Sequence, residues 1–180
     1  GGLVVTGYTR SYGSGGHNLW LFKTDPSGHP EWSFPFGGGA DDEGHAVRQT
    51  TDGGYIAVGF TQSAGAGGKD AWLVKTDAAG HQDWTRTFGG ASDDEAYAVA
   101  QTPDGGLIVA GVTSSYGAGS RDMWLIRTHA DGTPVWTRTL GGYGSDGAWS
   151  VSPTADHGFI LAGWTFSYGP GYVGNAWLVK

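Results

Sequence analysis

The amino-acid sequence predicts an all-β fold made of repeated, four-stranded antiparallel sheets. The first observation is a period of 52 residues: Gly1-Gly2, Gly53-Gly54, Gly105-Gly106 and His157-Gly158 follow one another at this spacing. The second is a composition of 35 Gly with 13% aromatic residues. Because disordered chains lack such apolar bulk, the glycines are expected to mark turns. The third is that no segment shows the apolar spacing of an amphipathic helix.

One copy of the repeat contains four strand-like segments separated by turn residues. The second segment is apolar almost throughout, as expected of a strand that is covered on both faces. The segments Pro103-Asp-Gly-Gly106 and His129-Ala-Asp-Gly132 supply the glycines that hairpin turns favour, because Gly adopts positive φ without steric cost. A longer Gly-rich loop joins the second and third segments. In the middle of the chain the strands are expected over 96–102, 107–113, 123–128 and 135–140.

This pattern predicts a β-propeller segment, because four antiparallel strands in a repeat of roughly 40–50 residues form one blade. The chain is expected to hold about three and a half blades in a single segment over 1–180, with repeats 1–52, 53–104 and 105–156 and a partial repeat 157–180. It begins at a second strand and ends inside a third, which leaves two open sheet edges. Since open edges pair with other chains, we expect further blades or a second chain to close the ring.

The composition argues against several classes of function. With 17 acidic and 10 basic residues the formal charge is −7, which disfavours nucleic acid, because phosphate binding needs clustered Lys and Arg. No apolar run approaches the roughly 20 residues of a membrane helix, so membrane insertion is not expected. The chain has no Cys, the His residues lack metal-binding spacing, and no serine-nucleophile motif occurs. We therefore expect no enzyme activity, no cofactor and no metal.

Recurring Trp and polar residues are expected to have structural roles. Repetition at fixed strand positions favours packing between neighbouring sheets over a ligand site, since each indole buries a large area. This applies to the columns Trp20, Trp72, Trp124, Trp177 and Trp32, Trp84, Trp136, and we also expect Trp149 and Trp164 to be buried. The recurring Asp42, Asp94 and Asp146 are expected to accept hydrogen bonds from backbone N–H groups in turns. Asn18, Asp70, Asp122 and Asn175 are expected to hold the preceding loop and to bond Thr9, Thr61, Thr113 and Thr165.

Any binding face is expected on the side of the sheets that carries the long loops. In an antiparallel meander, the loops between second and third strands share this side with the links from one repeat to the next. The opposite side carries only tight turns. Function concentrates on loops held by a rigid scaffold. The candidate ligand-binding residues on this side are Tyr12, His17, Asp42, Asp94, Tyr116, Arg121, Tyr143, Asp146, Tyr168 and Tyr172, and the alternative is that these rings only cover neighbouring loops.

Two motifs resemble those of known propeller repeats. The run from Ala98 to Thr113, followed by Asp122-Met-Trp124, resembles a WD-repeat, with its inner strand, Asp-Gly turn and apolar strand. The run from Leu73 to Trp84 is similar to the tryptophan-docking motif of quinoprotein propellers, in which Gly and Trp lie four residues apart. The whole chain looks like the repeats of secreted and surface-anchored bacterial and archaeal proteins. That resemblance implies a β-propeller fold and an extracellular or cell-surface location.

Three hypotheses about function follow. The leading one is a non-catalytic propeller scaffold whose loop face binds a protein or a glycan. The second is a lectin-like propeller with one sugar site in each blade, built from a loop Tyr with a neighbouring Asp or Asn. The third is a fragment of a quinone-dependent dehydrogenase propeller, which the Gly-to-Trp spacing alone suggests. Propellers host many functions, so the fold does not choose among them.

Overall fold

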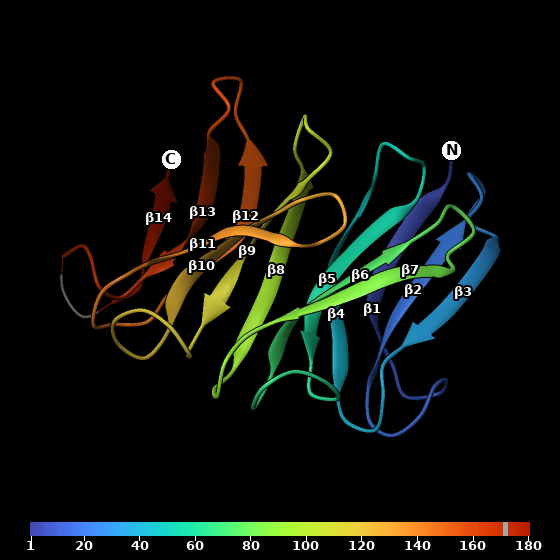
Figure 1. The fold of residues 1–180 in the computed structure, drawn as a ribbon, viewed down its shortest axis with the longest axis horizontal. Coiled ribbons are helices and arrows are strands. Elements are labelled where there is room, and N and C mark those ends of the chain that lie inside the picture. Colours follow the sequence, from blue (N-terminus) through green and yellow to red (C-terminus); the bar gives the residue numbers. More distant parts are fainter. Residues whose placement is uncertain (171–172) are drawn as a thin grey trace.

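The chain folds into antiparallel β-sheets in a computed structural model that describes residues 1–170 and 173–180. The described residues contain strands and turns and no helix (Figure 1). The strands are β1 (Leu3–Thr9), β2 (Asn18–Thr24), β3 (Pro30–Phe36), β4 (Asp42–Gln49), β5 (Tyr55–Thr61), β6 (Asp70–Thr76), β7 (Gln82–Phe88), β8 (Asp94–Gln101), β9 (Leu107–Thr113), β10 (Asp122–Thr128), β11 (Pro134–Leu140), β12 (Asp146–Pro153), β13 (Phe159–Thr165) and β14 (Asn175–Val179). The prediction of an all-β, antiparallel architecture is confirmed.

The strands form four sheets, each a meander in chain order. The first sheet is β1-β2-β3, the second β4-β5-β6-β7, the third β8-β9-β10-β11 and the fourth β12-β13-β14. The first sheet therefore lacks the repeat's first strand and the fourth lacks its last. In Figure 1 the sheets follow one another from the N-terminal end at the right to the C-terminal end at the left.

The expected strand bounds hold for β9 and shift by one or two residues elsewhere. The clearest difference is β8, which begins at Asp94 instead of 96, because Asp94 pairs with Thr113 across the ladder. It ends before Thr102, since the Thr102 N–H donates to the Gly106 carbonyl and its own carbonyl accepts from the Gly105 N–H. Thr102 therefore closes the turn and does not extend the strand.

Neighbouring sheets pack through their apolar faces. The first strands of successive repeats, β4, β8 and β12, contact one another in turn. Between the second and third sheets the core includes Leu73 and Val109. Trp72 and Trp124 are buried as expected, whereas the other Trp residues of the two columns are only half-buried, including Trp84 and Trp136 of the middle sheets.

Trp149 does not lie in the core, and the expectation that it is buried is wrong. Its side chain is 57% exposed. The reason is a bulge between Ala148 and Ser150, where the pairing of β12 with β13 skips one residue. The same irregularity recurs in β4 around His45 and in β8 around Tyr97. A bulged residue leaves the alternation of the strand, so these three side chains point away from the sheet interfaces.

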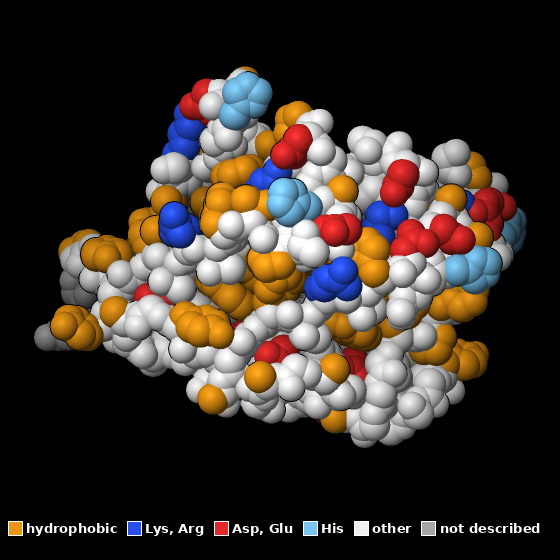
Figure 2. All heavy atoms as spheres, viewed as in Figure 1, with side chains coloured by type: hydrophobic (Ala, Val, Ile, Leu, Met, Phe, Trp, Pro, Cys, Tyr) orange, Lys and Arg blue, Asp and Glu red, His pale blue; other side chains and the backbone are white. Residues whose placement is uncertain are grey.

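The two ends of the sheets differ in length of connection and in charge. Tight turns join β4 to β5, β8 to β9 and β12 to β13 at the upper edge of Figure 1. In Figure 2 the Lys, Arg, Asp, Glu and His side chains gather in that upper half, while the lower half is mostly uncharged. On the face that Figure 2 shows, the charged side chains therefore lie mainly toward the tight-turn end.

One tight turn differs from its counterparts. Gly53 and Gly105 have positive φ values of 86° and 83°, and His157 holds the same position with φ 64°. This is the left-handed region, which a residue with a Cβ atom adopts at a cost. The turn between β12 and β13 is therefore strained.

Candidate binding face

The long loops are held by a buried carboxylate at the start of each first strand. Asp94 has no exposed surface. It accepts hydrogen bonds from the hydroxyls of Thr113 and Ser115, the latter at 2.6 Å, and from the Gly90 N–H at 2.9 Å. Asp42 and Asp146 are equally buried and make the equivalent contacts. Each carboxylate therefore ties a loop between strands to the link between repeats.

These bonds agree with the turn-stabilising role expected of the three aspartates. Burial by itself would raise the pKa of Asp146. Hydrogen bonds from Ser167, Thr165 and the Gly142 N–H outweigh burial and lower that pKa. The carboxylate is thus ionised and fully engaged within the protein. Although they lie beneath the loop face, Asp42, Asp94 and Asp146 offer it no exposed surface.

The polar residues that begin the third strands hold the second-to-third loops. The Asp70 carboxylate accepts from the Ala66 N–H at 2.9 Å, and the Asn18 amide donates to the carbonyls of Ser14 and Gly16. Burial raises the pKa of Asp70, the Ala66 N–H opposes this, and the nearby Asp94 charge adds to it. Burial and the charge of the nearby Asp146 raise the pKa of Asp122 in the same way.

The expected bonds from these residues to the threonines are wrong in three repeats. Thr61, Thr113 and Thr165 donate to the first-strand carboxylates Asp42, Asp94 and Asp146 instead. Each threonine lies opposite both candidates, since Thr113 pairs with Asp94 on one side and with Asp122 on the other.

The candidate tyrosines differ in how freely they are displayed. Tyr143 is 95% exposed and Tyr12 is 62% exposed. Tyr116 and Tyr168 are half-exposed, because each hydroxyl donates at 2.8 Å to the carbonyl of a Gly in the preceding link, Gly89 or Gly141. Tyr172 lies outside the described residues. Tyr143 and Tyr12 are therefore the freest aromatic groups on this face.

His17 and Arg121 belong to a band of charged and aromatic groups where the loops meet the inner strands. His17 Nδ1 lies 2.6 Å from Glu43, and its ring stacks on Tyr8 at 4.2 Å between centroids. Two cations, Lys69 and Arg121, approach the buried Glu95 at 3.5 and 3.4 Å. This second cluster neutralises a carboxylate that would otherwise be buried unpaired, which is costly.

The bulged aromatic residues form a ladder beside this band. His45 stacks on Tyr97 with 5.0 Å between ring centroids, and Tyr97 lies 4.6 Å from Trp149. Burial, followed by the charge and hydrogen bond of Glu95, raises the pKa of Tyr97 to about 12. The ladder was missed from the sequence. Its signal is an aromatic or His side chain recurring at one first-strand position, where the strand otherwise carries small residues.

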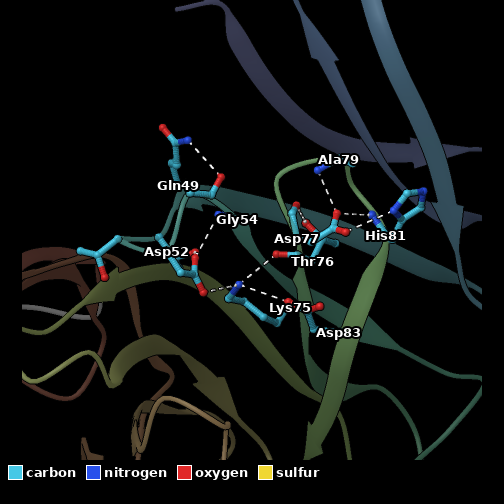
Figure 3. A network of polar contacts seen from close by, with 12 residues as sticks. Gln49, Asp52, Gly54, Lys75, Thr76, Asp77, Ala79, His81 and Asp83 are labelled. Atoms are coloured by element: carbon cyan, nitrogen blue, oxygen red, sulfur yellow. Dashed lines mark hydrogen bonds and ion pairs between the residues drawn. The ribbon is translucent and has the colours of Figure 1, made fainter.

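At the opposite end, buried cations brace the tight turns. Figure 3 shows the Lys75 ammonium between Asp52 and Asp83, with Nζ–O distances of 2.9 and 3.5 Å, and its bond to the Thr76 carbonyl. The Thr50 hydroxyl and then Lys75 outweigh burial and lower the pKa of Asp52 to about 2. At the equivalent turn, Arg127 Nη2 donates to both carboxylate oxygens of Asp104, at 2.7 and 2.6 Å.

The seam between the third and fourth sheets is open at this end. Between the second and third sheets the Gln101 side chain accepts from the Thr51 N–H at 2.9 Å. At the next seam the equivalent residues are Pro153 and Pro103, which supply neither the amide nor the N–H. A cavity of about 400 Å³, which these two prolines and Phe159 help to line, takes the place of the bridge.

The described residues show no grouping of three or more His, Asp or Glu side chains suited to a metal ion. They also contain no helix long and apolar enough to cross a membrane.

Comparison with known proteins adds information about the fold alone. No family model and no curated protein matches the chain. One similar solved structure is a protein of unknown function from Bacteroides caccae, with a TM-score of 0.52 and 11% sequence identity. The match covers 81% of this chain and 47% of the other, so the chain spans about half the length of the structure it matches. At this identity the likeness extends to the fold and leaves the function open.

Proposed function

We propose that the chain is a non-catalytic β-propeller segment whose long-loop face binds a protein or a glycan at an extracellular or cell-surface location. The observation that carries the proposal is that the buried residues holding the loops are constant between repeats, while the exposed loop residues vary. The same buried carboxylate anchors three loop clusters, while the outward residues differ: Tyr143 stands where the two earlier copies have Gly39 and Ala91. A rigid base with variable loops is the usual design of a binding face.

The propeller arrangement is supported by what the end sheets leave uncovered. Leu3 is 65% exposed, whereas its counterparts Tyr55 and Leu107 are 4% and 2% exposed beneath the preceding sheet. Leu178 is 69% exposed, whereas its counterpart Leu125 is 5% exposed beneath the following sheet. These exposures support the expectation that another sheet of the same repeat packs on each end face, from further blades or from a second chain.

Sedimentation of the 180-residue chain tests this second part of the proposal. A second chain supplying the missing sheets predicts a reversible oligomer that Leu178→Glu dissociates, because the substitution places a charge in the new interface. The matched control is Val135→Glu, which changes an exposed apolar residue on a fourth strand. A compact, cooperatively folding monomer would show that the end faces need no partner sheet.

The binding face is tested by screening glycans and secreted or surface proteins against the chain and two single variants. Tyr143→Ala removes the most exposed ring of the loop face, and we expect capture to fall at least tenfold, as for an aromatic anchor in an interface. His29→Ala is the control, because it lies at the tight-turn end with a 79% exposed side chain. Equal loss in both variants, or capture that survives Tyr143→Ala and Tyr12→Ala together, would refute a loop-face site.

A further inference from the structure

In two repeats a tyrosine side chain occupies a seat between neighbouring sheets at the loop end. The Tyr116 hydroxyl donates to the Gly89 carbonyl at 2.8 Å, and its ring centroid lies 5.8 Å from that of Trp124. Tyr168 repeats the arrangement one copy later, with its hydroxyl 2.8 Å from the Gly141 carbonyl and its ring 5.4 Å from Trp177. The seat thus consists of an indole wall and a backbone carbonyl at the distance of a para-hydroxyl.

In the second repeat this seat is empty of its tyrosine. Residue 64, which is 52 positions before Tyr116, is Ala. A cavity of about 440 Å³ opens there, lined by Gly37, Ser63, Ala64, Trp72, Thr85 and Arg86 among others. Trp72 is the counterpart of Trp124, and Gly37 is the counterpart of Gly89. The volume falls within the range of roughly 300–1,000 Å³ that small-ligand sites occupy.

The other residues that line the cavity are the same as their counterparts in the third repeat, which holds Tyr116. Thr85-Arg-Thr87 has the same sequence as Thr137-Arg-Thr139. In both copies the Arg side chain donates to the carbonyl of the preceding Thr at 2.9 Å and lies over the neighbouring Trp, 5.6 or 5.8 Å from the ring. The second repeat therefore keeps the whole seat and lacks only the side chain that fills it.

We propose that the Ala64 cavity binds a phenol ring, namely a tyrosine side chain presented by a partner polypeptide. The ring packs against Trp72, where an aromatic pair is favoured beyond its buried area. The phenol hydroxyl donates to the Gly37 carbonyl, as Tyr116 does to Gly89. The inference rests on the proposed function for its setting, because the cavity opens at the loop face, and it names the chemistry that this face recognises there.

A phenol satisfies this seat better than a phenyl ring. The chain itself provides the evidence, since the seat holds a phenol twice, with one donor aimed at one acceptor. A phenylalanine ring would cover the Gly37 carbonyl without supplying that donor, and burying an acceptor unpaired is costly.

Titration with N-acetyl-tyrosinamide, followed by nuclear magnetic resonance, tests the proposal. We expect one saturable site with a dissociation constant in the roughly millimolar range of small fragments, with shifts centred on the Trp72 indole N–H. N-acetyl-phenylalaninamide is expected to bind at least about fivefold more weakly, because it lacks the donor to Gly37. Equal affinity for the two amides, or saturation by methyl glucoside in place of the tyrosine amide, overturns the assignment.

Two substitutions change the number of sites in opposite directions. Ala64→Tyr is expected to fill the cavity, abolish binding and raise the unfolding midpoint. Tyr116→Ala is expected to empty the equivalent seat and give a second site for the same amide. The matched control, Ala66→Tyr, adds a tyrosine to the same exposed loop outside the cavity and is expected to leave one site. Binding that survives Ala64→Tyr refutes the proposal, whatever happens in the other variants.

The outcome is separable from that of the proposed function. Tyr143→Ala alters the loop face without touching any residue that lines the Ala64 cavity. If the unchanged chain captures a glycan or a protein but does not bind the tyrosine amide, this inference alone is refuted. If Tyr143→Ala loses capture but still binds the tyrosine amide, the inference about the Ala64 cavity is supported independently of the loop-face result.

Discussion

Asp94→Ala is expected to destabilise the protein strongly, because this carboxylate has no exposed surface and accepts several hydrogen bonds. Its removal leaves the Gly90 N–H, now 2.9 Å from the carboxylate, without that acceptor, whereas the Ser114 N–H keeps the Asp93 carbonyl at 2.9 Å. It also breaks the bonds that the Thr113 and Ser115 hydroxyls donate to an ionised acceptor, which are worth about 1.5–3 kcal/mol each. Each buried donor left unpaired costs about 1–3 kcal/mol. The hydroxyls of Thr113 and Ser115 can turn toward each other, and no charge remains to be buried, which offsets part of the loss. The net expectation is about 3 kcal/mol.

Urea denaturation monitored by Trp fluorescence measures this loss. With a slope of about 1–3 kcal/mol per molar urea, the midpoint of Asp94→Ala is expected to fall by roughly 1–3 M relative to the unchanged chain. Asp131→Ala is the control, because Asp131 is exposed and bonds only its near neighbour Thr133. A midpoint for Asp94→Ala that is no lower than that of the control would refute the anchoring role assigned to the buried carboxylates.

Four further substitutions test the strain, the charge and the packing described above. His157→Gly is expected to raise the stability by about 0.5–1 kcal/mol in thermal unfolding, because it relieves a left-handed backbone at φ 64°. Asp70→Asn is expected to stabilise the protein at pH 7: the raised pKa of the Asp70 carboxyl means that burying its charge costs stability above that pKa. This advantage shrinks as the pH falls and the native carboxyl takes up its proton, so midpoints at pH 7 and pH 4 check the sign. Trp149→Ala is expected to cost under about 1 kcal/mol, and Trp124→Ala about 3–5 kcal/mol, in urea denaturation; similar losses would contradict their different burial.

The architecture could be predicted from the sequence because local signals and the repeat agree. Alternating and continuous apolar runs specify strands, and Asp-Gly or Gly-Gly pairs specify the turns between them. The bounds of β9 match the prediction because the strand is buried throughout and lies between a tight turn and a Gly-rich loop. The structural roles of Asp94 and its counterparts were also readable, since a recurring Asp in a Gly-rich turn has few other uses.

What the sequence could not provide was the choice between geometrically equivalent partners. Thr113 lies opposite both Asp94 and Asp122, and only the three-dimensional placement of the hydroxyl decides between them. Trp149 follows the apolar pattern of a core residue, but the bulge beside it reverses the direction of its side chain. The Ala64 cavity could not be predicted, because the sequence does not show that the counterpart of Ala64, Tyr116, fills a space between sheets.

Pro153 and Pro103 stand where Gln101 and Thr51 form their bridge one repeat earlier, and this difference affects how the protein unfolds. In a protein built of repeats, overall stability is approximately the sum of each unit and its coupling to its neighbours. The last junction lacks the amide bridge and carries a void, so at the tight-turn end the fourth sheet is held less firmly to the third than the third is to the second. Amide hydrogens of β13 are therefore expected to exchange with solvent before those of the central strands β5 and β9.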